Sequence, residues 1–319
     1  MTMPRFTHLT PSTLDEALNL LKEKGGKANI VAGGSDLMVH LKQRTATPDY
    51  VVNIKGLPVL NGISSGPGDT VAIGSLTTLD ALCRSEIISK HFPILAEAAG
   101  KVASVQIRNV ATLGGNLCTG APSADTATTL LVLGAQVKLR NLKGERTIPL
   151  EGFFKGPGET VLEQGEILTG VVIPAPLPHT GSAYWKHQRR QALDLPMVGV
   201  SVLLSLSTNR ISCTDLRRER APVSTILQAL EKDDVICREV RIALGVAAPT
   251  PMRAFSAERL LRGQKLSDSL LDQAAQAASD EAQPRDSIRG EAWYRRDMIK
   301  VFVKRMAVMC IERIALPAG

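Results

Sequence analysis

Residues 106–116 read QIRNVATLGGN, and residues 30–37 read IVAGGSDL. Each stretch contains one glycine pair, Gly33-Gly34 in the earlier one and Gly114-Gly115 in the later one. Glycine lets the backbone approach a ligand closely and adopt positive φ, so that successive N–H groups point into one concavity that suits phosphate. A single Gly-Gly pair is more often a plain turn. Two such pairs indicate a site that grips a pyrophosphate from both sides, with two plain turns as the alternative.

Other catalytic and metal-binding patterns are absent from the sequence. It contains neither GxGxxG nor GxxxxGK[ST], which disfavours the two commonest nucleotide-binding folds. The five histidines are dispersed and show no HExxH spacing. The five cysteines form no CxxC pair, which argues against a zinc or iron–sulfur framework. We therefore expect no catalytic side chains and no metal on this chain.

Composition narrows the class of protein. Hydrophobic residues make up 44% and charged residues 22%, as in ordinary globular chains, while aromatic residues make up only 3%. The net charge of +7 comes from dispersed basic residues without interleaved aromatics, which favours an acidic partner subunit or a solvated surface over nucleic acid. No stretch approaches the ~20 apolar residues of a membrane span, and residues 1–13 do not resemble a signal peptide. We expect a cytoplasmic protein, consistent with its sparse cysteines.

Hydrophobic periodicity predicts an α+β chain in two unequal parts. Thr13 and Glu16 form a capping box before an amphipathic helix that ends at Gly25. The proline-rich residues 174–178 indicate a boundary, so we expect domains at 1–176 and 177–319. The expected strands are 28–31, 51–54, 71–73, 137–140, 146–149, 184–187, 199–206 and 240–246, the last three in an antiparallel sheet. The expected later helices are 77–90, 94–103, 257–261, 267–278 and 293–313.

Asp125 follows the second glycine pair closely. Its carboxylate is suited either to capping a helix that starts at Thr126 or to accepting a hydrogen bond from a ribose hydroxyl. The residues by themselves leave both roles open.

Several motifs resemble one known family. Residues 32–37, AGGSDL, resemble the AGGTDL loop of FAD subunits in molybdenum hydroxylases, and residues 106–116 are similar to their QIRNxATxGGN loop. The stretches 121–125 (APSAD), 153–158 (FFKGPG), 166–168 (EIL), 184–190 (YWKHQRR) and 240–253 (VRIALGVAAPTPMR) follow in family order. The similarity extends over nearly the whole chain and is greatest to the separate FAD chains of bacterial xanthine dehydrogenases and similar dehydrogenases.

The resemblance implies a fold and a set of cofactor contacts. It implies a vanillyl-alcohol-oxidase (PCMH)-type FAD-binding domain of two subdomains, followed by a C-terminal α/β domain. Both glycine stretches would hold the FAD pyrophosphate through backbone N–H groups, Asp125 would contact ribose or ribityl hydroxyls, and Lys186 would lie near the flavin. Without the family, Lys186 reads as a solvated strand residue. The implied FAD-binding residues are Ile30, Val31, Ala32, Gly33, Gly34, Ser35, Asp36, Leu37, Val102, Thr112, Leu113, Gly114, Gly115, Asn116, Asp125, Leu168 and Lys186.

The implied function is electron transfer. A large subunit would carry the molybdopterin cofactor, and a small subunit would carry two [2Fe–2S] clusters and pass electrons to the FAD of this chain. The flavin would then reduce NAD or another acceptor, in a heterotrimer or a dimer of heterotrimers. The alternative is a scaffold subunit of such a complex that has lost its flavin.

One segment departs from the family pattern. Residues 214–238 interrupt the point where the family runs directly into the RIALG strand. Val223, Ile226, Leu227 and Leu230 follow helical spacing, so we expect one amphipathic helix peripheral to the FAD site. Cys213 and Cys237 bracket the segment, and we expect both as free thiols.

Overall fold

The structure is a computed structural model that describes residues 3–208, 232 and 235–315. The chain divides into two compact units. The first comprises residues 1–121 and 134–175, and the second comprises residues 122–133 and 176–319. Residues 122–133 therefore belong with the C-terminal part of the chain, although they precede the last strands of the first unit.

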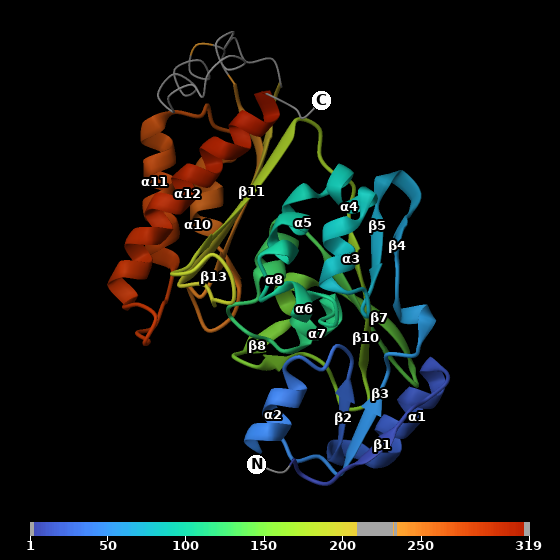
Figure 1. The fold of residues 1–319 in the computed structure, drawn as a ribbon. Coiled ribbons are helices and arrows are strands. Elements are labelled where there is room, and N and C mark those ends of the chain that lie inside the picture. The colour runs from blue at the N-terminus through green and yellow to red at the C-terminus, as the bar shows by residue number, and fades with distance from the viewer. Residues whose placement is uncertain (1–2, 209–231, 233–234, 316–319) are drawn as a thin grey trace. The chain divides into compact units, whose positions relative to one another are not determined.

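The first unit contains two sheets of three or more strands, which match the two subdomains expected, and one two-stranded sheet. The three-stranded sheet is parallel, in the order β1-β3-β2, and the five-stranded sheet is antiparallel, in the order β4-β5-β10-β6-β7 (Figure 1). The strands are β1 (Thr7–Leu9), β2 (Ala28–Val31), β3 (Tyr50–Asn53), β4 (Ile63–Ser65), β5 (Val71–Gly74), β6 (Gln136–Asn141), β7 (Gly144–Pro149) and β10 (Ile167–Ile173), with β8 (Phe154–Gly156) and β9 (Glu159–Thr160) as a separate pair.

Short helices complete the first unit. They are α1 (Leu14–Lys24), α2 (Leu37–Gln43), α3 (Leu79–Arg84), α4 (Glu86–His91), α5 (Pro93–Gly100), α6 (Val105–Arg108) and α7 (Leu113–Cys118). The start of α1 confirms the predicted cap, because Thr13 Oγ1 accepts the Glu16 N–H at 3.1 Å. The carboxylate of Glu16 reaches back to Ser12 rather than to Thr13.

Two local predictions in the first unit are wrong. The helix expected over 77–90 is two helices, because the backbone of Ser85 is extended. The Ser85 hydroxyl accepts a hydrogen bond from the Ile88 N–H and so caps the start of α4. The turn expected at Gly114-Gly115 is the first turn of α7. Thr112 caps that helix by accepting the Gly115 N–H at 3.1 Å, which stabilises helical backbone where glycine alone disfavours it.

The second unit is an antiparallel sheet in the order β11-β12-β13-β14 with helices on both faces. Its strands are β11 (Thr180–His187), β12 (Val198–Leu206), β13 (Cys237–Gly245) and β14 (Met252–Arg253), and its helices are α8 (Asp125–Val132), α10 (Phe255–Leu261), α11 (Asp268–Glu281) and α12 (Ala292–Ala315). In Figure 1 the orange and red helices α10, α11 and α12 cover one face, and the green α8 packs on the other. Every residue of β12 is buried, as expected for a strand covered on both sides.

Strand β13 begins earlier than predicted. It starts at Cys237, which pairs with Leu206 at the end of β12, rather than at Val240. Val235 is also fully buried in the core of the second unit. Cys237 and Arg238 therefore belong to β13, and Val235 belongs to the core of the second unit. The helix expected from Val223, Ile226, Leu227 and Leu230 lies outside the described residues, as does Cys213.

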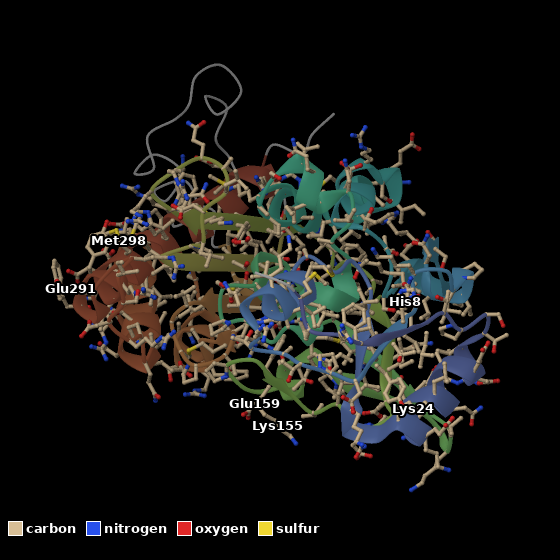
Figure 2. All side chains as sticks on the ribbon, turned by 60° about the horizontal axis from the view of Figure 1, so that its bottom comes forward. His8, Lys24, Lys155, Glu159, Glu291 and Met298 are labelled. Atoms are coloured by element: carbon tan, nitrogen blue, oxygen red, sulfur yellow. The ribbon has the colours of Figure 1, made fainter. Side chains whose placement is uncertain are left out.

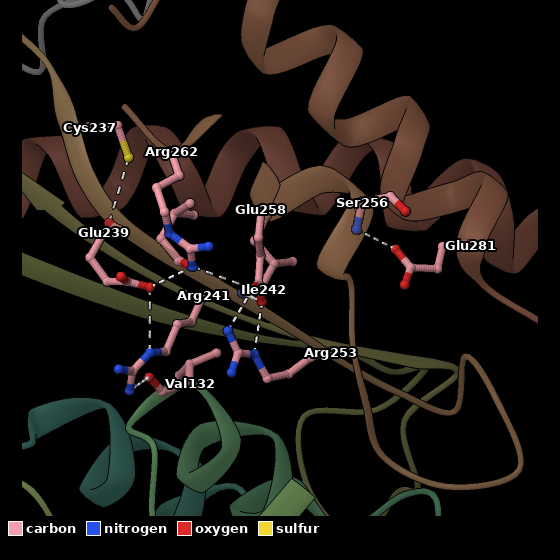
Figure 3. A network of polar contacts seen from close by, with 11 residues as sticks. Val132, Cys237, Glu239, Arg241, Ile242, Arg253, Ser256, Glu258, Arg262 and Glu281 are labelled. Carbon is pink, nitrogen blue, oxygen red and sulfur yellow. Dashed lines mark hydrogen bonds and ion pairs between the residues drawn. The ribbon is translucent and has the colours of Figure 1, made fainter. Parts of the chain in front are cut away.

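A buried carboxylate joins α10 to the sheet. Glu258 accepts hydrogen bonds from the Ile242 N–H and from Arg253 Nε, both at 2.9 Å (Figure 3). The Arg262 guanidinium donates to the Glu239 carboxylate at 2.8 Å and lies 3.9 Å from the Glu258 carboxylate, so it links the two carboxylates. A carboxylate that is 1% exposed is tolerated there because each acceptor is matched by a donor.

Candidate functional site

The loop between β2 and α2 has backbone N–H groups that remain available for a ligand. Gly34 adopts φ +80°, the left-handed region that favours glycine. No hydrogen bond to another described residue uses the backbone N–H groups of residues 33–37. Such a run of unpaired N–H groups in a glycine-containing loop suits an anionic ligand such as a pyrophosphate.

The first unit brings the two glycine stretches together. A Cβ on Gly33 would meet the carbonyl oxygen of Val110 and would lie 2.8 Å from Ala111 Cα. Asp36 accepts a hydrogen bond from the Thr119 hydroxyl at 3.1 Å. The two stretches therefore lie in contact, and glycine at position 33 is required for that approach.

The second stretch uses its N–H groups within the protein. Leu113 and Gly114 donate to the carbonyl oxygens of Thr77 and Ser75, at 2.9 and 2.8 Å. Gly115 and Asn116 donate to the side chain and the carbonyl of Thr112. A Cβ on Gly114 would lie 2.6 Å from Ser75 Cβ, so this glycine lets α7 pack against the end of β5. The predicted roles of residues 112–116 toward FAD stay predictions.

Two more of the predicted residues lie in the first unit. Leu168 is 4% exposed and lies next to a bulge in β10, where the pairing with β6 shifts register before Gly170. Arg146 bonds both carboxylate oxygens of Glu166, which anchors the start of this strand. Val102 is partly buried, and its carbonyl oxygen accepts a hydrogen bond from Arg108 at 2.8 Å.

The second unit places Asp125 and Lys186 together. Lys186 Nζ donates to Asp125 Oδ2 at 2.9 Å, and the two side chains are only 2% and 4% exposed. The Tyr184 hydroxyl donates to the other carboxylate oxygen of Asp125. Strand alternation explains the pairing, because Tyr184 and Lys186 lie two residues apart on one face of β11.

The pairing register shows which face this is. Tyr184 lies opposite Ser201 of β12, and the Ser201 hydroxyl contacts Thr128 of α8 at 3.0 Å. The intervening Trp185 points to the opposite face, where its ring stacks on Phe302 of α12. Tyr184 and Lys186 therefore face α8, whose first residue is Asp125.

This arrangement excludes one alternative for Asp125 and one for Lys186. The predicted cap is wrong, because α8 starts at Asp125 and has no side-chain cap. The solvated alternative for Lys186 is also wrong, because its side chain is buried. The contact of Asp125 with a ribose hydroxyl stays a prediction.

Burial keeps Tyr184, which hydrogen-bonds Asp125 beside Lys186, in its protonated form. Desolvation raises the pKa of Tyr184 well above its ordinary value, and the charge of Asp125 and their hydrogen bond raise it further. Tyr184 therefore stays protonated at neutral pH and donates to Asp125. No motif in the sequence indicated a role for Tyr184, although its position two residues before Lys186 in a predicted strand places both on one face.

The described residues contain neither a metal-binding cluster nor a helix that could span a membrane. Among them, no group of three or more His, Cys, Asp and Glu side chains is placed to hold a metal ion. None of the helices in the described ranges has the length and apolar run that a membrane span requires.

Comparison with known proteins identifies the family. Residues 4–176 match the family model described as the FAD binding domain in molybdopterin dehydrogenase, and residues 221–309 match the CO dehydrogenase flavoprotein C-terminal domain. The chain is 33% identical over 296 residues to the xanthine dehydrogenase FAD-binding subunit of Escherichia coli O157:H7, covering 92% of each chain. It is 33% identical over 305 residues to the carbon monoxide dehydrogenase medium chain of Hydrogenophaga pseudoflava, covering 96% of each.

A solved structure agrees with both sequence relatives. A chain of the reconstituted CO dehydrogenase from Oligotropha carboxidovorans superposes with a TM-score of 0.87 at 30% identity, over 98% of this chain and 100% of that chain. The chain therefore belongs to the FAD-binding medium subunits of molybdenum hydroxylases of the xanthine and CO dehydrogenase type. Its relatives are oxidoreductases, and the predicted α+β fold and the FAD cofactor are confirmed.

Proposed function

We propose that this chain carries electrons from the [2Fe–2S] clusters of a small partner subunit, through its FAD, to NAD or another acceptor. A large molybdopterin-binding subunit would oxidise the substrate in the same complex, a heterotrimer or a dimer of heterotrimers. FAD, when bound, supplies a centre that takes up electrons one at a time and releases a pair as hydride. The roles of this chain are then to bind and orient that cofactor and to set the electrostatics around it.

The residues present fit such a cofactor. The observation that carries the proposal is the run of unpaired N–H groups over residues 33–37, which supplies donors for a pyrophosphate without a lysine. Gly34 gives this loop its left-handed backbone, and the close approach of Gly33 to Val110 holds the second glycine stretch against it. A pyrophosphate distinguishes FAD from FMN, so these contacts support FAD.

The second unit supplies a buried ion pair. Lys186 is a cation whose ammonium group is fixed by Asp125, and Asp125 is held in turn by Tyr184. A fixed cation close to a flavin stabilises the negative charge that accumulates on reduction. We propose this role for Lys186, with Asp125 as the residue that orients it.

The state of the cysteines supports a proposal for the cellular compartment. The described cysteines, Cys83, Cys118, Cys237 and Cys310, form no disulfide with one another. Burial raises the pKa of Cys237 to about 12, so that this thiol stays protonated and unreactive at neutral pH. We propose a cytoplasmic location, where free thiols persist.

The test uses the complex purified through a tag on this chain, with its two partner subunits co-expressed. Released flavin is identified by chromatography after denaturation, and molybdenum and iron are measured by mass spectrometry. Anaerobic stopped-flow mixing with xanthine, then with NAD⁺, follows flavin absorbance near 450 nm. Flavin reduction after xanthine is added, followed by flavin reoxidation by NAD⁺ or by a dye acceptor, is the expected result. FMN or no flavin in a folded preparation, or a complex without molybdenum and iron, would contradict the proposal.

A further inference from the structure

The connection between α11 and α12 and the start of α12 together gather arginines around two exposed apolar side chains. Residues 285–296, here called the 285–296 surface, contain four arginines and two carboxylates. Ile288 is 93% exposed and Trp293 is 61% exposed. Arg285 and Arg296 are exposed, and Arg289 is partly exposed. Figure 2 labels Glu291, which belongs to this surface, and Met298, which follows it in α12.

Hydrogen bonds hold this segment in one conformation. Ser287 and Gly290 bond each other's backbone in both directions at 3.1 Å, which closes the turn that carries Ile288. The Ala292 N–H donates to Asp286 at 2.6 Å, so Asp286 caps the start of α12. A preformed surface loses little conformational entropy when a partner binds.

Arg295 leaves an excess of positive charge beneath the turn. Its side chain is 2% exposed, and it donates to two neutral oxygens, the Ser287 hydroxyl at 2.6 Å and the Val246 carbonyl at 3.3 Å. Its Nε has no acceptor. A buried guanidinium without a paired carboxylate is costly, since the attraction that normally offsets desolvation is missing.

The surrounding charges do not cancel this excess. Burial and the positive charges of Arg285 and Arg289 lower the pKa of Arg295, and Asp286 opposes them as the weakest contribution. An arginine remains protonated despite such a shift. The second carboxylate, Glu291, accepts the indole N–H of Trp293. The 285–296 surface is therefore positive around an exposed isoleucine and an exposed tryptophan.

These features identify the kind of partner. Tryptophan and arginine are the residues most enriched among those that dominate binding energy at protein interfaces, and complementary charge selects the partner. A symmetric contact with a second copy would place arginines against arginines, because a two-fold interface uses the same patch on both chains. Carboxylates on a different chain would instead pair with these arginines.

We propose that the 285–296 surface binds an acidic surface of another subunit of the complex, burying Ile288 and Trp293 and pairing the arginines with the partner's carboxylates. This inference rests on the proposed function, because it takes the multi-subunit complex as given. The expected binding is sensitive to salt, since exposed charge pairs are screened.

The test compares two double variants in the tagged, co-expressed complex. Ile288→Asp with Arg289→Glu alters the surface, and Val59→Asp with Arg5→Glu makes the same chemical changes at exposed positions of the first unit. Subunit composition is measured by mass photometry on dilution. We expect the first variant to weaken association by at least about tenfold, with FAD content and melting temperature unchanged, and the control to assemble normally.

Two further readouts separate the outcomes. A photo-crosslinker at position 288 should attach to an Asp- or Glu-rich peptide of a different subunit. Attachment to a second copy of this chain, no attachment, or unchanged assembly of the variant would overturn the inference. A raised KM for NAD⁺ with assembly intact would also overturn it, by assigning the arginines to a dinucleotide. A wild-type preparation lacking the other two subunits would instead overturn the proposed function.

Discussion

Lys186 and Asp125 form a buried ion pair, with 2.9 Å between Nζ and Oδ2, although 61 residues separate them in the chain. The pair joins the C-terminal end of β11 to the first residue of α8, so that it fixes both the helix and the cation. Because both charges are removed from water, each depends on the other for its stability. The Lys186–Asp125 pair therefore contributes both to the proposed charge near the flavin and to the stability of the second unit.

The first prediction follows from that dependence. Replacing Lys186 with Met leaves Asp125 as a buried charge whose cation is lost, so the free energy of unfolding should fall by about 3–5 kcal/mol. Adding Asp125→Asn removes the remaining charge and should recover part of the loss. Urea unfolding of the single and double variants measures both values. A loss below about 1 kcal/mol in Lys186→Met would show that the pair contributes little.

Lys186→Met should also separate cofactor binding from turnover. We expect FAD to remain bound, with slower NAD⁺-linked turnover and a more negative flavin reduction potential, because a stabilising cation is lost. Potentiometric titration of the variant and the wild type checks this. An unchanged potential would count against the proposed role of Lys186.

Tyr184→Phe is expected to alter the dependence of stability on alkaline pH. The pKa of Tyr184 is raised in the folded state, chiefly by burial, so the folded protein resists its deprotonation. The stability this contributes is complete below the unfolded pKa of about 10 and decreases as pH rises beyond it. Denaturant titrations between pH 8 and 11, chosen to bracket that value of about 10, should show a steeper decline in the wild type than in the variant. Parallel declines would contradict the assignment.

The two glycine pairs should respond differently to substitution. Gly34→Val introduces a β-branched residue at φ +80°, so we expect loss of FAD through distortion of the loop that carries the unpaired N–H groups. Gly114→Ala places a Cβ against Ser75, so we expect lower stability of the first unit together with flavin loss. Gly26→Ala is the control, because nothing lies within 4 Å of its added Cβ. Normal FAD content in Gly34→Val would show that this glycine only forms a turn.

A deletion between β12 and β13 tests the predicted insert. Removing 214–238 would remove Val235 and Cys237 from the core, so we expect that variant to misfold. Replacing 209–234 with a short Gly-Ser linker keeps both residues and should preserve FAD content. Flavin absorbance and melting temperature distinguish the two deletion variants. Loss of FAD from the shorter deletion in a folded protein would contradict the peripheral position expected for this segment.

The sequence was sufficient for features that depend on near neighbours. The side-chain cap at Thr13, the strands around the Lys143-Gly144 hairpin and the long helix that begins at Ala292 were predictable, because caps, turns and hydrophobic periodicity act within a few residues. The family motifs also indicated the cofactor. Local pattern failed at Ser85, where a serine cap divides an apparently continuous helix, and at Gly114, where Thr112 stabilises a helix despite two glycines.

Tertiary structure alone decided the partners of the charged residues. Alternation in β11 places Tyr184 and Lys186 on one face, but only the register with β12 and the packing of α8 bring Asp125 to that face. The grouping of residues 122–133 with the second unit and the burial of Arg295 among other arginines depend equally on contacts between distant segments. Local spacing determines the direction of a side chain within its own element. Which group it meets there depends on how separate elements pack, since contacts across many residues leave no periodic signal in the chain.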